Sequence, residues 1–223
     1  MSLVLNIETA TKNCSVCLAE SGNIISYKES ASEQYQHGEL LHHYIKACLA
    51  DAQCDFSALD AVAISKGPGS YTGLRIGVSA AKGYCFALDI PLIAVNTLDI
   101  LAKRHPIATG YMVPMLDARR MEVYAKVLDH HGSEIRETRA EILTEESFTP
   151  YLEKDTVYFL GDGVSKWKTI CTHTNAVYLD ILYPSARTMC VLSHQKFVSK
   201  IFENVAYFEP YYLKEFIGLQ KKR

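Results

Sequence analysis

Residues 67–75, with the sequence GPGSYTGLR, have the composition of a loop that binds an anion. They follow an apolar run at residues 61–64 and open a long helical pattern. Glycine lets another group approach the main chain closely, and a helix N-terminus presents free N–H groups at the positive end of its dipole. The loop therefore fits a phosphate cradle. A tight strand-to-helix turn without any ligand explains the same glycines equally well.

The other residues that could act as nucleophiles or metal ligands lack the spacing that such sites need. The seven cysteines are irregularly spaced, and the C-x-x-C pair Cys14 and Cys17 lies in an expected strand, where residues three apart point to opposite faces. The eight histidines form no HExxH motif, and the chain has neither a GxSxG elbow nor a Walker lysine motif. We therefore predict no catalytic residue and no metal site.

The composition is that of a soluble globular protein. Of the 223 residues, 48% are hydrophobic and 22% are charged, and the formal net charge of −2 provides no general attraction for nucleic acid. No apolar run reaches the roughly 18 residues of a membrane span. The N-terminus lacks the basic segment of a signal peptide. We therefore expect a cytoplasmic protein that makes no contact with a membrane.

Hydrophobic periodicity predicts an α/β protein with two lobes. In the first half we expect strands at residues 3–9, 14–20, 23–30, 61–65 and 91–95, and helices at 37–52, 73–88 and 98–103. This order resembles one lobe of the actin-like ATPase fold. In the second half we expect strands at residues 112–115, 122–129 and 157–160, and helices at 145–153, 164–171 and 188–202. The predicted lobes are residues 1–105 and 106–223.

Four short motifs together resemble one protein family. They are IETA at residues 7–10, GPGSYTGLR at 67–75, DARRMEVY at 117–124 and PYYLK at 210–214. On these motifs the chain is similar, over nearly its whole length, to the TsaB (YeaZ) family of bacterial proteins. The resemblance implies an actin-like ATPase fold of the ribonuclease H-like (ASKHA) class, with two related lobes of which the second is reduced.

The resemblance also implies a role in tRNA modification. In that family the protein is a noncatalytic subunit of the complex that makes threonylcarbamoyladenosine at adenosine 37. It binds and activates the transferase TsaD, its catalytic paralogue, together with the small ATPase TsaE. It also forms a homodimer, and tRNA is contacted only through the complex.

The catalytic paralogue carries two histidines spaced HxxxH, and the matching positions here are Thr97 and Leu101. Neither residue type suits a metal site, because leucine has no lone pair to offer and threonine alone is rarely enough. The turn at residues 8–13 lacks the glycine that lets phosphates approach. We therefore expect no cofactor, apart from a weak, vestigial nucleotide site at Glu8, Gly67, Gly69 and Gly73.

Two helices carry the expected partner surface. The three glycines at residues 73–83 cost helix stability, which suggests that a neighbour approaches the helix closely. The resemblance implies that the helices of the first lobe mediate both the contact with TsaD and the self-dimer. The predicted interface residues are Leu41, Ile45, Leu74, Val78, Ala81 and Cys85.

Two enzymes are the alternatives. One is a small actin-like, ATP-dependent phosphotransferase that uses the loop at residues 67–69 for ATP. The other is an M22-type, glycoprotease-like peptidase homologue, against which the absent HxxxH pair argues. Stabilisation of the fold by Mg-ATP would distinguish the phosphotransferase from a noncatalytic subunit.

Overall fold

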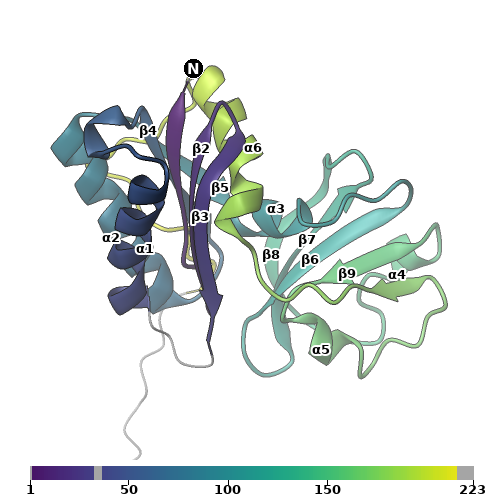
Figure 1. Ribbon diagram of the computed structural model, residues 1–223. Helices are drawn as coiled ribbons and strands as arrows, with labels where there is room; N and C mark the ends of the chain where they lie inside the picture. The colour runs from purple at the N-terminus through teal and green to yellow at the C-terminus, as the bar shows by residue number, and fades with distance from the viewer. Residues whose placement is uncertain (1, 33–36, 215–223) are drawn as a thin grey trace, which may run out of the picture.

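The computed structural model describes residues 2–32 and 37–214, which form two lobes side by side (Figure 1). Each lobe is built on a five-stranded mixed sheet. Within the described residues, no helix is long and apolar enough to span a bilayer.

The first sheet has the strand order β3-β2-β1-β4-β5. Its strands are β1 (Leu3–Glu8), β2 (Asn13–Glu20), β3 (Asn23–Ala31), β4 (Ala61–Gly67) and β5 (Leu92–Asn96). The first three strands are antiparallel, because tight turns join them, whereas β1, β4 and β5 are parallel, because helices connect them.

Helices cover both faces of the first sheet (Figure 1). The helices α1 (His37–Asp51) and α2 (Tyr71–Leu88) pack on one face, against alternate strand residues such as Leu5 and Ile64. The helices α3 (Thr97–Ala102) and α6 (Ala186–Val198) cover the other face, where Ile100 and Met189 pack on the intervening strand residues. The alternation of side chains along a strand thus supplies two separate cores. A short 3₁₀ turn, η1 (Phe56–Ala58), precedes β4.

The second sheet repeats the topology of the first on a smaller scale. Its strand order, β8-β7-β6-β9-β10, is again third, second, first, fourth and fifth. The strands are β6 (Tyr111–Asp117), β7 (Glu122–Asp129), β8 (Glu134–Ile142), β9 (Val157–Leu160) and β10 (Ala176–Tyr178). Two one-turn helices, α4 (Thr149–Leu152) and α5 (Val164–Trp167), stand where the first lobe has α1 and α2. The predicted actin-like fold with a reduced second lobe is confirmed.

The predicted elements of the first half all form, but two strands of the second half were missed. The predicted helices at residues 145–153 and 164–171 shrink to α4 and α5. The strand β8 was not predicted because this edge strand exposes charged residues and lacks a clear apolar face. The strand β10 was not predicted because it spans only three residues.

The predicted lobe boundary needs one correction. The chain enters the second sheet at β6 (Tyr111–Asp117), which begins just after the expected break between residues 104 and 110. However, α6 returns to the first lobe and packs on its sheet (Figure 1), and Glu203 pairs with Leu92 of β5. Residues from about 185 to 208 therefore belong to the first lobe rather than to a second lobe of 106–223. Sequence order alone could not show this return.

Candidate functional site

The glycine loop joins β4 to α2 in a sharp turn. Gly67 has a φ of +111°, in the region that favours glycine. Ser70 caps α2, and its hydroxyl oxygen accepts a hydrogen bond from the N–H of Gly73 at 3.3 Å. Both residues therefore serve the turn itself.

Gly69 and Gly73 allow this turn to pack against the segment that follows β1. A Cβ on Gly69 would overlap the carbonyl oxygen of Ala10, and one on Gly73 would overlap that of Thr9. The N–H of Ser70 donates to the carbonyl of Ala10 at 2.7 Å, and the hydroxyl of Thr9 donates to the carbonyl of Gly73 at 2.8 Å. The close approach that these glycines permit is thus made by the chain's own backbone.

Glu8 is fully buried at the end of β1. Its Oε1 accepts the N–H of Ala10 at 2.6 Å, while Oε2 has no hydrogen-bond partner among the described residues. Burial raises the pKa of Glu8 to about 7, against the opposing effects of the Ala10 N–H and the Ser65 hydroxyl. A buried carboxyl with no cation beside it suits a structural role better than contact with a phosphate.

A cleft of about 740 Å³ lies between the lobes, beside the glycine loop. Its walls are formed by residues 10–12, 68–72, 116–119 and 211–214, with single side chains from other loops. Of the residues predicted to bind a nucleotide, Gly69 lines this cleft. Glu8, Gly67 and Gly73 do not line it.

The carboxylates of the cleft are held by the second lobe. Asp117 forms an ion pair with Lys166 at 2.7 Å. The Oδ1 atom of Asp162 accepts the N–H of Asp117 at 2.8 Å. Burial raises the pKa of Asp162, which disfavours its charged form. These contacts leave less charge available for a magnesium ion or a nucleotide.

The C-terminal segment crosses this cleft. The N–H of Tyr211 donates to the carbonyl of Lys66 at 2.6 Å, and a Cβ on Gly67 would meet the carbonyl oxygen of Tyr211. The Tyr212 hydroxyl accepts a hydrogen bond from Arg75 at 3.3 Å, and Lys214 forms an ion pair with Glu122 of the second lobe. The glycine loop is therefore contacted by the chain on two sides.

Known proteins share this architecture and sequence. The family model for TsaD, described as tRNA N6-adenosine threonylcarbamoyltransferase, matches residues 28–215. The tRNA threonylcarbamoyladenosine biosynthesis protein TsaB of Haemophilus influenzae is 30% identical, over 98% of this chain and 96% of that protein. The chain belongs to the TsaB family.

Further relatives agree with the family. TsaB of Escherichia coli is 29% identical, over 98% of this chain and 97% of that protein. The solved structure of YeaZ from Pseudomonas aeruginosa has a TM-score of 0.81 and 27% identity, and the match covers 96% of this chain and all of that one.

Thr97 and Leu101, the two positions compared above with the HxxxH pair of the paralogue, serve packing here. The Thr97 hydroxyl accepts the N–H of Gly67 at 3.2 Å, and Thr97 is fully buried. Leu101 packs in an apolar cluster between the lobes with Leu98, Met112 and Leu160. In this TsaB family member, Thr97 therefore holds the glycine loop, and Leu101 packs between the two lobes.

The six residues predicted for the partner interface lie in the core instead. Each is at most 4% exposed, and α1 and α2 turn these side chains toward the first sheet or the Thr9–Ala10 segment rather than toward solvent: Leu41, Ile45, Leu74, Val78, Ala81 and Cys85. Their periodicity correctly marked an apolar stripe on each helix, but that stripe stabilises the lobe. A TsaB partner that contacts these helices has to use their outer faces.

The outer face of α2 has features that the first lobe does not need. Phe86 is 85% exposed. Gly83 has open space where a Cβ would lie, unlike Gly73 and Gly77, which pack against Thr9. Beside them, Tyr84 donates or accepts a hydrogen bond with His42 of α1 at 2.9 Å and stacks on Phe56. Sequence reasoning missed Phe86 because it followed the buried stripe.

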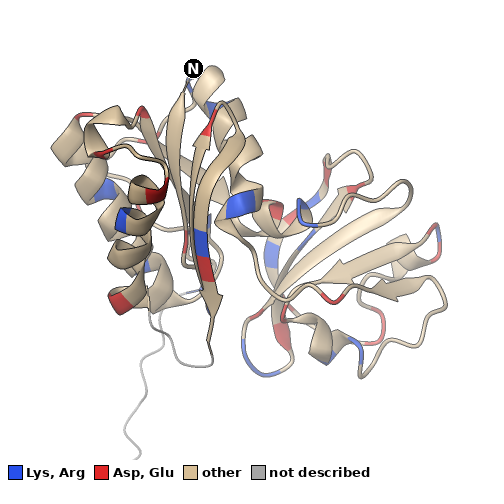
Figure 2. Cartoon of the chain, viewed as in Figure 1, with Lys and Arg blue, Asp and Glu red and all other residues tan. Residues whose placement is uncertain are grey.

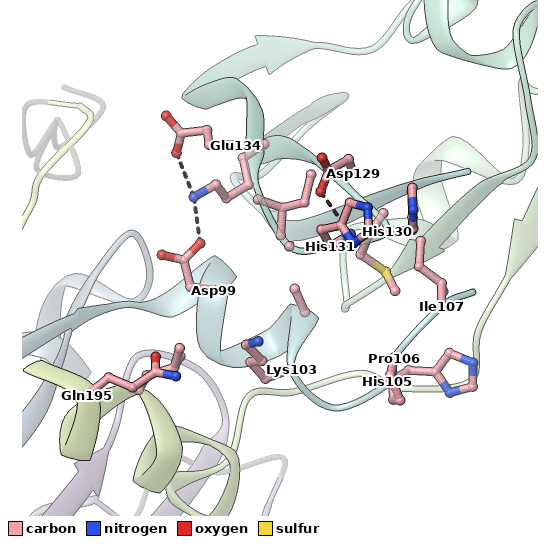
Figure 3. Close-up of a pocket in the computed structure, with 16 residues that line it drawn as sticks. Asp99, Lys103, His105, Pro106, Ile107, Asp129, His130, His131, Glu134 and Gln195 are labelled. Atoms are coloured by element: carbon pink, nitrogen blue, oxygen red, sulfur yellow. Dashed lines mark hydrogen bonds and ion pairs between the residues drawn. The ribbon is translucent and has the colours of Figure 1, made fainter. Parts of the chain in front are cut away.

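A second cavity, of about 470 Å³, lies between α3, α6 and the β7–β8 turn (Figure 3). Lys126 is buried there and forms ion pairs with Asp99 at 2.5 Å and Glu134 at 2.7 Å. Burial alone would lower the pKa of Lys126, but the two carboxylates raise it above its ordinary value. Within residues 2–32 and 37–214, no cluster of histidine, cysteine and acidic side chains is suited to a metal ion.

Proposed function

We propose that the chain is a noncatalytic subunit of the machinery that makes threonylcarbamoyladenosine at adenosine 37 of tRNA. In this proposal it binds the TsaD transferase and, together with TsaE, activates it in the cytoplasm. Two full-length relatives are named as biosynthesis proteins of this nucleoside, which supports the pathway. The match to the TsaD family model supports kinship with the transferase.

The described residues support a noncatalytic role. The carboxyl of Glu8 is buried, and the glycine loop packs on the backbone of Thr9 and Ala10. The hydroxyl of Thr97 accepts a hydrogen bond from the glycine loop, and Leu101 lies in an apolar cluster. These arrangements stabilise the protein, and none of them positions a reacting group.

Charge supports an indirect relation to tRNA. The net charge is −2, and Figure 2 shows Lys and Arg interspersed with Asp and Glu over both lobes rather than gathered on one face in this view. A protein that binds RNA directly needs clustered cations to neutralise phosphates. We therefore assign the main tRNA contacts to the partner.

The outer face of α2 is the observation that carries the partner proposal. An exposed glycine inside a helix costs about 1 kcal/mol relative to alanine, and none of the described residues packs where a Cβ on Gly83 would lie. An exposed aromatic side chain such as Phe86 is the residue type that anchors protein interfaces. A partner helix that approaches Gly83 and packs on Phe86 explains both features. A second copy of the chain would compete for the same face.

Two variants separate binding from folding. Leucine at position 83 improves helix propensity but fills the space that a partner needs, so Gly83→Leu should raise stability and weaken binding. Phe86→Ala should leave stability nearly unchanged and weaken binding at least about tenfold, as loss of an interface anchor does. Titration calorimetry with the TsaD protein of the same cell measures the affinity, and the threonylcarbamoyladenosine content of its tRNA measures the activity.

Val198→Ala is the matched control, because Val198 is 66% exposed on α6, on the opposite side of the first sheet. It should bind TsaD like the unaltered protein. Sedimentation without TsaD reports whether the same two variants also weaken a self-dimer. Wild-type affinity in both α2 variants would exclude this face as the binding surface.

A further inference from the structure

We propose that residues 209–214 form a detachable clasp over the glycine-loop end of the interlobe cleft. The outer part of the C-terminal segment is held by a few exposed contacts, while the part before it is anchored in the first lobe. The clasp opens without unfolding the anchor. The inference concerns access to the cleft and does not depend on the partner proposed above.

The anchor consists of residues 203–208. The N–H of Glu203 donates to the carbonyl of Leu92 at 2.9 Å, which extends the edge of the first sheet. Val205 and Phe208 pack against the core beneath α2. The ammonium group of Lys82 donates to the carbonyls of Ala206 and Phe208 at 3.2 and 3.0 Å. Apolar burial and several hydrogen bonds thus fix this part.

The clasp has weaker attachments. Its main-chain link among the described residues is the hydrogen bond from Tyr211 to Lys66. Tyr212 contacts Arg75 through its hydroxyl and Tyr71 through its ring, at 5.2 Å between centroids, yet it remains 36% exposed. The ion pair between Lys214 and Glu122 is at the surface, where such pairs contribute about 0–1 kcal/mol.

The clasp forms part of the wall of the interlobe cleft. Residues 211–214 line the same cleft as residues 68–72 of the glycine loop, and Lys214 reaches across to the second lobe. A ligand or partner segment that enters this end of the cleft therefore contacts the clasp, and opening of the clasp widens the entrance. Side-chain contacts that remain partly exposed, as at Tyr212 and Lys214, are features of segments that open locally at low free energy.

Residue-resolved amide hydrogen exchange on the full chain tests the clasp. After correction for intrinsic rates, the amide of Tyr211 should exchange at least about tenfold faster than those of Glu203 and Phe208, because it opens separately. Lys214→Ala should speed exchange at Tyr211 about two- to fivefold, as loss of an exposed ion pair allows. Tyr212→Ala should speed it about tenfold, because it also removes an aromatic contact.

Two further variants make the test specific. Glu122→Gln should act like Lys214→Ala, and the double variant should exchange no faster than either single one, since both remove one ion pair. Lys46→Ala, which alters an exposed lysine of α1 far from the cleft, should change nothing. If Tyr211 exchanges as one unit with Glu203 and Phe208, or if no clasp variant alters it, the segment is a fixed part of the first lobe and the inference is wrong.

Discussion

The two lobes share one strand topology but use it differently. In each lobe, an antiparallel meander of three strands is followed by two parallel strands. The strand order across each sheet is third, second, first, fourth, fifth. In the first lobe the connecting helices are α1 and α2, with 15 and 18 residues, whereas in the second they are α4 and α5, with 4 residues each. The second lobe keeps the sheet and loses the helical layer, so only the first lobe offers a long helical face.

The loops that face the cleft are also counterparts. Gly161 and Gly163 come just after β9, much as Gly67 ends β4 and Gly69 comes just after it, and a Cβ on Gly161 would overlap the carbonyl oxygen of Met115 within β6. In both lobes, a glycine just after the fourth strand packs on the backbone of the first strand or of the segment that follows it: Gly69 on Ala10 and Gly161 on Met115. Because both lobes show this packing, it is a feature of the fold. A glycine loop at this position is therefore not enough to indicate a ligand site.

The largest difference in stability that we expect is between the acidic residues that end the first strand of each lobe. Glu8 ends β1, buried and without a cation, while Asp117 ends β6, exposed and paired with Lys166. The pKa of Glu8 rises from 4.5 to about 7 on folding. The folded state therefore favours the protonated form, and stability falls as pH rises from 4.5 to 7, by about 3 kcal/mol in all.

Glu8→Gln should remove this pH dependence. The free energy of unfolding of the variant, minus that of the unaltered protein, should therefore rise by about 3 kcal/mol between pH 4.5 and pH 8. Asp117→Asn, the counterpart in the second lobe, should change stability by at most about 1 kcal/mol, the value of an exposed ion pair. Urea unfolding at several pH values measures both. Equal pH slopes for Glu8→Gln and the unaltered protein would contradict the assigned role of the burial.

A second contrast lies within α2. Gly73→Ala places a methyl group against the carbonyl of Thr9, so it should lower the free energy of unfolding by roughly 2 kcal/mol, as overpacking does. Gly83→Ala meets open space and should raise it by roughly 0.5–1 kcal/mol through helix propensity. Thermal and urea unfolding measure both variants. A stabilised Gly73→Ala protein would show that the loop does not need this close contact.

The smallest expected effect concerns nucleotide. A site occupied at 100 times its Kd stabilises a fold by about 2.7 kcal/mol, and this is roughly 5–10 °C in Tm for a chain of this size. Because the glycine loop packs on the protein itself, we predict no such shift with millimolar Mg-ATP. Differential scanning fluorimetry with and without Mg-ATP checks this, and a rise of several degrees would favour the phosphotransferase.

The sequence predicted the first sheet, three strands of the second and the long helices, because their apolar periodicity reports burial directly. It predicted the stripe on α1 and α2 that includes Leu41 and Val78, but periodicity does not say whether a stripe faces a core or a partner. At the glycine loop the sequence left open both a ligand and a tight turn, and the contact of Gly69 with the carbonyl of Ala10 accounts for that glycine by packing. The clasp places Tyr212 against Arg75, 137 positions earlier in the chain, and no local sequence pattern can predict such a contact.

The return of α6 to the first sheet sets the order in which the protein can mature on the ribosome. One face of the first sheet, with Val4, Ala63 and Val95, is covered by Met189 and its neighbours on α6. During synthesis the first 105 residues emerge long before this cover does, and they present an apolar sheet face in the meantime. Transiently exposed apolar surface of this kind is what chaperones bind, so we expect the nascent chain to need them until α6 is made.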